Sequence, residues 1–192
     1  MVKLMSLDAR EVHAVLKKIR KEGRLNPVDA HTSAIAYLKE QIPLADAEED
    51  QAYLYHCIAE QHSLYRYVDE EEMVLVDIMG LFPKAPMTWI SASGFYLNER
   101  SDVERAIELA KTAVQVAEEV GHFVVHANNT LCRAAKQAKN YALMEEAIMR
   151  LLNYKHSTGS MDSAYECDFL IGLPEAAISE ILVRKLRALC KR

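Results

Sequence analysis

The stretch MTWISASGFYLNERSDVERAIELAKTAVQVAEEV, residues 87–120, decides the fold that we predict for this chain. Two helical patterns meet there at a polar turn, residues 98–102. Small residues stand on both sides of the turn, namely Gly94 before it and Ala106, Ala110 and Ala113 after it. Small residues let two helix backbones approach closely, so the stretch predicts a helical hairpin in which Gly94 lies against Ala106.

The same stretch resembles a tetratricopeptide repeat. The resemblance rests on Ile90, Gly94 and Leu97 in the first helix and on Val103, Ala106, Ala110 and Ala113 in the second. Residues 52–85 and 125–158 follow the pattern more weakly, with Glu71 and Met144 where alanine is usual. The three segments start 35 and 38 residues apart, against a period of about 34 in that family. The third segment also allows a register shifted by three residues.

The resemblance implies an all-α fold, a right-handed α-α superhelix of stacked antiparallel helix hairpins with flanking N- and C-terminal helices. We expect a single domain over residues 1–192. Its parts are an N-terminal helix pair in 7–46, three hairpins in 47–156, and C-terminal capping helices in 164–192. An unrelated helical bundle is the alternative, because small residues occur at helix contacts in any α fold.

Hydrophobic periodicity predicts further helices outside the central stretch. On the N-terminal side they cover residues 7–22, ending at Gly23, then 27–42 from Pro27, 46–66 capped by Asp46, and 69–81. On the C-terminal side they cover 122–138 and 141–154, followed by a polar linker at 156–163 and a last helix from Pro174. About nine or ten helices result, and no strand pair is predicted.

Composition narrows the class of protein. Of the 192 residues, 51% are hydrophobic and 27% charged, which is typical of a soluble globular protein. The net charge of −5 argues against nucleic-acid binding through bulk charge. The longest apolar runs fall far short of a membrane span, and the N-terminus lacks a signal-peptide pattern, so we expect a cytoplasmic protein that does not bind membranes. The four cysteines form no CxxC pair and are interpreted as reduced thiols.

In a stack of hairpins, the first helix of each pair lines the concave side. The alignment therefore predicts a peptide-binding groove lined by Thr88, Ser91, Phe95, Asn98, His126, Asn129, Arg133, Lys136 and Gln137. The preceding unit adds Tyr53, His56, Glu60 and Ser63. In the last helix of the groove, this set faces away from an apolar side that consists of Ala127, Leu131, Ala134 and Ala138.

The residue types of this groove indicate an extended or helical peptide as ligand. Asn129 would bond the backbone amides of the peptide, while Arg133 and Lys136 would meet an acidic group, Arg133 with two parallel bonds. The family's full set of carboxylate-binding residues is not present. The alternative is that the same residues form an ordinary solvated helix face.

The sequence gives little support for a catalytic or metal-binding site. His122, His126 and Glu119 have helical metal-ligand spacings, but Gly121 interrupts them, and the sequence has no HExxH, GxSxG or glycine-rich phosphate loop. The acidic run 69–72 stands at a predicted helix start, where negative charge is favourable. We therefore predict no catalytic residue, metal or cofactor. A basic set near the C-terminus is interpreted as part of a capping helix, with an acidic membrane or a partner helix as alternatives: Arg184, Lys185, Arg187, Lys191 and Arg192.

The sequence thus favours a non-enzymatic scaffold that binds a protein or peptide. One alternative is a chaperone or regulatory adaptor for a secreted or signalling partner. Another is a small helical metal-dependent enzyme that uses His122, His126 and nearby carboxylates. Self-association into a homodimer is also expected to be feasible, because a short stack leaves apolar ends unless they are capped.

Overall fold

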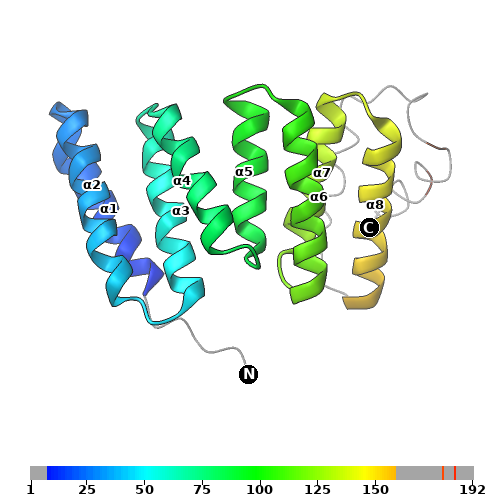
Figure 1. The fold of residues 1–192 in the computed structure, drawn as a ribbon, viewed down its shortest axis with the longest axis horizontal. Helices are drawn as coiled ribbons and strands as arrows, with labels where there is room; N and C mark the ends of the chain where they lie inside the picture. The colour runs from blue at the N-terminus through cyan, green and yellow to red at the C-terminus, as the bar shows by residue number, and fades with distance from the viewer. Residues whose placement is uncertain (1–7, 159–178, 180–183, 185–192) are drawn as a thin grey trace. The chain divides into compact units, whose positions relative to one another are not determined.

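The computed structural model describes residues 8–158 together with Ser179 and Arg184. These residues form eight α-helices and two short 3-10 turns, and no strand occurs among them (Figure 1). The helices are α1 (Ala9–Glu22), α2 (Pro27–Gln41), α3 (Glu48–Leu64), α4 (Val68–Leu81), α5 (Pro86–Asn98), α6 (Val103–Val120), α7 (Val124–Gln137) and α8 (Tyr141–Thr158). The all-α prediction is confirmed.

Consecutive helices pair into antiparallel hairpins at the predicted places. The segments expected at 52–85, 87–120 and 125–158 correspond to α3–α4, α5–α6 and α7–α8, and the expected N-terminal pair is α1–α2. Gly121 ends α6 in the left-handed conformation, with φ of 73°, which is the usual role of a glycine just past a helix. Gly121 therefore separates α6 of the central hairpin from α7.

The chain divides into two compact units, Met1–Ala92 and Ser93–Arg192, with the boundary inside α5. In the first unit, Asp8 caps α1, and Asn26 with Pro27 starts α2. Its core joins α1, α2 and α3 through buried apolar side chains, including Leu16, Leu38 and Leu54. Whether the whole chain is a single domain stays a prediction.

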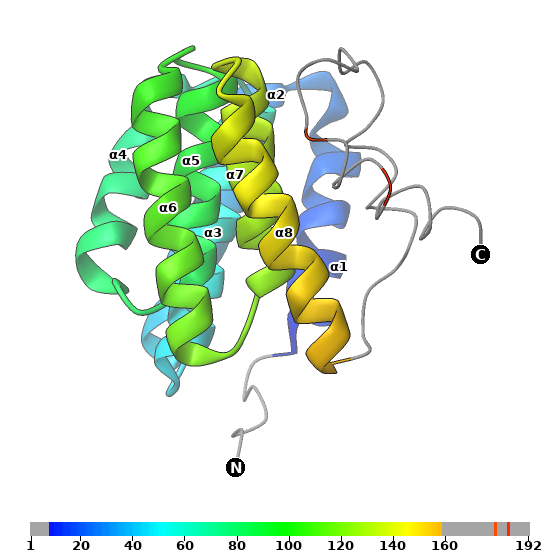
Figure 2. The same ribbon diagram turned by 90° about the vertical axis from the view of Figure 1, so that its right-hand side faces the viewer.

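In the second unit, α7 packs between its neighbours in the chain, α6 and α8, as Figure 2 shows. Leu97 of α5, Ala106 of α6 and Ala134 of α7 form one buried cluster, so the α5–α6 hairpin packs against α7 of the next hairpin through small side chains. On the surface, the Arg150 guanidinium of α8 lies 3.0 Å from carboxylate oxygens of both Glu118 and Glu146. The hydrogen bonds to these carboxylates raise the pKa of Arg150.

The predicted contact between Gly94 and Ala106 is wrong. A Cβ built on Gly94 would meet no described atom within 4 Å, so no backbone crosses there. The neighbouring residue makes the contact instead: the buried Ser93 hydroxyl donates a 2.8 Å hydrogen bond to the Ala106 carbonyl. Ala106, Ala110 and Ala113 are fully buried, as expected. The close approach that glycine permits occurs in the first unit, where a Cβ on Gly23 would lie 2.2 Å from Ala30 Cβ.

Three smaller expectations also need correction. Asp46 does not cap α3, because the helix starts at Glu48 and its N-cap position is held by Ala47, which makes no side-chain cap. Ala138 is exposed, since α7 ends at Gln137. The linker predicted from residue 156 begins inside α8, which extends to Thr158.

The rest of that linker and most of the capping helix predicted from Pro174 lie outside the described residues. One described contact involves this part of the chain, because the Ser179 amide donates a 3.1 Å hydrogen bond to Glu145 of α8. Within the described residues, none of the helices is both long and apolar enough to cross a membrane.

Candidate functional site

Helix α7 presents two chemically different sides. Its inner side is buried and consists mainly of Ala127, Leu131, Ala134 and Ala135. Its outer side carries the predicted groove residues, spaced at three and four positions so that they share one face. We call this set the α7 face, and it consists of His126, Asn129, Arg133, Lys136 and Gln137. All of these are exposed except Asn129, which is half-buried.

Arg133 and Asn129 stand one helical turn apart at the centre of the α7 face. Among the described residues, no carboxylate lies within ion-pair distance of Arg133, and its guanidinium is exposed. The Asn129 side-chain oxygen is shielded from solvent and finds no hydrogen-bond partner in the described part of the chain. Because a guanidinium prefers two parallel bonds to a carboxylate, the centre of the α7 face has the chemistry to hold an acidic group.

An aromatic side chain that the sequence analysis missed extends this face. Phe123 precedes α7, is 46% exposed, and places its ring edge-on to His126 with centroids 5.9 Å apart. Its φ of 59° is rare for a bulky residue and is usually strained. Only Gly121 hinted at an unusual backbone nearby, so neither the conformation nor the exposure of Phe123 could be read from residue spacing.

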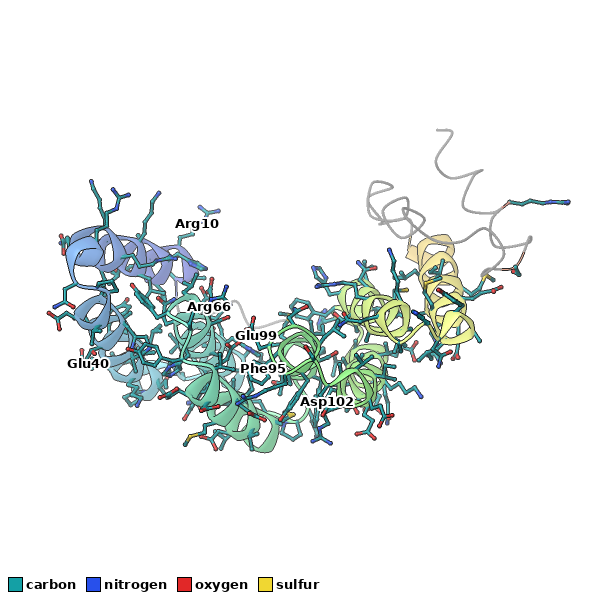
Figure 3. The ribbon with its side chains drawn as sticks, turned by 90° about the horizontal axis from the view of Figure 1, so that it is seen from above. Arg10, Glu40, Arg66, Phe95, Glu99 and Asp102 are labelled. Carbon is teal, nitrogen blue, oxygen red and sulfur yellow. The ribbon has the colours of Figure 1, made fainter. Side chains whose placement is uncertain are left out.

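Two predicted groove residues do not line an accessible surface. Thr88 is fully buried, and Phe95 is 4% exposed. The Phe95 ring lies edge-on to Tyr96 at 5.3 Å and under the Arg100 guanidinium at 5.6 Å, beside the turn that leads to Asp102 (Figure 3). Both side chains therefore serve packing. Ser91 is half-buried and Asn98 is exposed at the end of α5, and their part in a groove stays a prediction.

The residues predicted on α3 belong to the first unit and vary in exposure. Glu60 is exposed, whereas Tyr53, His56 and Ser63 are half-buried. Burial lowers the pKa of His56 to about 4, so this ring is neutral at physiological pH. The His13 ring lies edge-on to Tyr53 at 6.1 Å. These contacts indicate that much of this α3 face packs against the same unit.

The candidate metal and catalytic groups do not assemble. No group of three or more His, Cys, Asp or Glu side chains with metal-site geometry occurs within the described residues. Burial raises the pKa of Cys57 to about 11 and of Cys132 to about 12, which suppresses the nucleophilic thiolate. The acidic run lies in the first turn of α4, where Asp69, Glu70 and Glu71 face the positive end of the helix dipole.

Antiparallel hairpins of one kind, stacked through small residues, define the class: this is an all-α hairpin-repeat protein. Comparison with solved structures specifies the fold. The nearly identical TPR-like repeats assigned to a kinesin light chain of Podosopora anserina superpose with a TM-score of 0.61 at 14% identity, covering 94% of each chain. BtubC from P. vanneervenii superposes with a TM-score of 0.62 at 11% identity, covering 95% of this chain and 89% of that one.

The chain therefore has a tetratricopeptide-like helical repeat fold, as the sequence predicted. No model of a protein family matches the sequence, and no curated protein does. At such low identity, the likeness to the two solved structures describes the fold alone.

Proposed function

We propose that this protein is a non-enzymatic scaffold that binds a protein or peptide partner through the α7 face. Repeat folds of this type commonly serve protein interaction, and the buried thiols and scattered histidines supply no evident catalytic group. The observation that carries the proposal is the exposed Arg133 guanidinium, which has no carboxylate partner among the described residues and stands beside Asn129.

The proposed ligand is an extended peptide with an acidic group. Arg133 would hold the acidic group, and Asn129, one helical turn before it, would bond the peptide backbone. Lys136 and Gln137 follow on the same face and would add further polar contacts toward the end of α7. At the opposite end, the rings of Phe123 and His126 would contact an apolar side chain of the peptide.

The experiment is a selection from a displayed random-peptide library against the purified protein, followed by fluorescence anisotropy with the selected peptides. Arg133→Ala is expected to weaken binding about tenfold or more, because a charge-assisted hydrogen bond contributes about 1.5–3 kcal/mol. Asn129→Ala should weaken binding roughly two- to tenfold, because a neutral hydrogen bond contributes about 0.5–1.5 kcal/mol. The matched control is Lys111→Ala, which removes an exposed cation from α6 and should leave binding unchanged. Added salt should weaken binding of the wild-type protein more than that of Arg133→Ala.

The selected peptides themselves provide a second test. Enrichment of acidic residues in the peptides would support the proposal. Equal affinity of wild type and Arg133→Ala for every selected peptide would exclude the α7 face as the binding site. A selection that yields no binder to the intact chain would contradict the proposed function altogether.

A further inference from the structure

Two histidines from different helices are hydrogen-bonded in the first unit, away from the α7 face. His31 of α2 and His62 of α3 place Nε2 and Nδ1, respectively, 3.1 Å apart. One ring nitrogen must donate and the other must accept, so the bond requires at least one of these two nitrogens to lack a proton. His62 is buried and His31 is half-buried, which shields the bond from water.

Aromatic rings from a third segment surround the pair. The His31 ring stacks on Tyr67 with centroids 4.3 Å apart and 18° between the planes, and it lies edge-on to Tyr65 at 5.3 Å. Both tyrosines belong to the turn between α3 and α4. His31 is therefore the place where α2 contacts the α3–α4 hairpin through polar as well as aromatic groups.

The hydrogen bond tolerates one added proton but not two. A neutral pair shares one N–H···N bond, and a singly protonated pair keeps the same bond with a charged donor. A second proton leaves N–H groups on both facing nitrogens and places two like charges side by side. The bond is then lost, and repulsion replaces it.

The surroundings oppose protonation on balance. Burial is the main influence on both rings, and it lowers the pKa of His31 and of His62 below the ordinary value of 6.5. Glu70 of α4 acts in the opposite direction on both, while His31 and Lys39 lower the pKa of His62 further. The folded state thus binds fewer protons than the unfolded state below about pH 6.5, and its stability must decline there as the pH falls.

We propose that the His31–His62 pair is an acid-sensitive link that holds α2 against the α3–α4 hairpin and weakens when both rings are protonated. The apolar core shared by α1, α2 and α3 stays in place, so acid loosens the packing rather than unfolding the unit. Local opening of α2 is the observable consequence. If the pKa of one ring is lowered by 1, the opening equilibrium can change about tenfold.

The experiment measures hydrogen exchange of the full chain by mass spectrometry between about pH 7.5 and pH 5, the range in which histidine charge changes. Rates are corrected for intrinsic exchange, and α7 serves as the internal reference. Peptides from α2 are expected to lose protection relative to α7 as the pH falls. His62→Gln should reduce this difference to the part that His56 contributes, because glutamine can keep a hydrogen bond to His31 but does not titrate. The matched control is His13→Gln, which removes an exposed ring from α1.

A second measurement keeps the proposal testable if His62→Gln does not fold. Proton NMR titration of the wild-type imidazoles should show His31 and His62 titrating in coupled steps below pH 6.5. Independent titration of the two rings at the ordinary histidine value would overturn the proposal. So would α2 protection that follows α7 across the whole pH range.

Discussion

Arg66 and Lys139 occupy the same position in two different hairpin turns. Both have left-handed backbones, with φ of 64° and 56°. In each case the next residue closes the turn with a 2.9 Å hydrogen bond to the carbonyl five residues earlier, Tyr67 to His62 and Asn140 to Ala135. Ser101, with φ of 55°, takes the same place in the central hairpin. The three turns are 35 and 38 residues apart. The repeat is therefore visible in the backbone conformation of the turns, although the residues at this position differ.

Replacement of Lys139 by glycine should stabilise the protein. Left-handed backbone costs a residue with a Cβ roughly 1–2 kcal/mol, and glycine avoids this cost at a smaller entropic penalty. We expect Lys139→Gly to raise the free energy of unfolding by about 0.5–1 kcal/mol. Lys139→Val should lower it by more than 1 kcal/mol, since a branched Cβ is most strained there. Urea denaturation of both variants measures the difference, and a glycine variant less stable than wild type would contradict this account of the turn.

The hairpins and their register could be predicted from the sequence because both depend on local pattern. Ala106 lies five residues after Ser101, and Glu71 and Met144 lie five residues after Arg66 and Lys139. All three side chains are buried, although only one is alanine. Spacing therefore identified equivalent positions where residue type did not. The register shifted by three residues is excluded, since the Met144 amide makes the same first-turn bond in α8, to the Asn140 carbonyl, that the Ala106 amide makes in α6, to the Asp102 carbonyl.

Which side of a helix makes the contact was harder to predict. Neighbouring residues on a helix point about 100° apart, so the choice of Gly94 instead of Ser93 was an error of one position. The same limit explains Thr88 and Phe95, which were assigned to an open groove and are buried. Periodicity identifies an apolar side well, but the edge between buried and exposed positions depends on the neighbouring helices.

The two glycines with opposite surroundings should respond oppositely to alanine. Gly94→Ala places a methyl group where no described atom lies within 4 Å, so the better helix propensity of alanine should dominate. We expect a gain of about 0.5–1 kcal/mol in the free energy of unfolding. Gly23→Ala should instead destabilise, because its Cβ would collide with Ala30 at 2.2 Å. Thermal denaturation distinguishes the two variants. If Gly94→Ala proved less stable than the wild type, Gly94 would be in close contact with a neighbouring group, which would contradict the structure.

The Ser93 hydroxyl should contribute measurably to the central hairpin. Ser93→Ala removes a buried 2.8 Å hydrogen bond to the Ala106 carbonyl, and we expect a loss of about 0.5–1.5 kcal/mol. Ser91→Ala, a half-buried site on the same helix, is the matched control. The comparison of urea midpoints tests the bond. Equal stability of the two variants would mean that the hydroxyl contributes nothing beyond packing.

The candidate site was only partly predictable, for a related reason. The α7 face follows from spacing along one helix, so all five of its residues could be assigned from the sequence. Phe123 depends on a left-handed backbone between two helices, and the His31–His62 bond joins residues 31 positions apart. Contacts of this kind require the tertiary packing itself, which a single sequence does not specify.

The buried thiols should report the opening of each unit separately. Cys57 lies in the core of the first unit, and Cys132 lies in the second, with its sulfur 3.8 Å from the Met144 carbonyl. In a variant with Cys167 and Cys190 replaced by serine, both thiols should react with maleimide far more slowly than in urea. Peptide mapping of the labelled protein gives the two rates. A fast native reaction at either thiol would contradict its burial.

His56 should make folding sensitive to acid even without the His31–His62 pair. Burial lowers the pKa of this ring to about 4, and its Nε2 has no hydrogen-bond partner among the described residues. In the unfolded chain His56 is protonated near pH 6.5, whereas in the folded chain it is protonated only near pH 4. The stabilisation is therefore complete above pH 6.5 and is lost as the pH falls toward 4. Between these pH values, the free energy of unfolding should change by up to about 1.4 kcal/mol per pH unit through this one proton.

His56→Leu should reduce the decrease of the free energy of unfolding between pH 6.5 and pH 4 while leaving the fold intact. Leucine fills a similar volume and does not titrate. The free energy of unfolding in urea, measured at several pH values from 7 down to 4, gives the slope. His126→Leu is the matched control, since that ring is exposed on α7 and its removal should change the slope little. If the wild-type and His56→Leu slopes coincide over this range, the ring is solvated in the folded protein, and its burial on α3 is wrong.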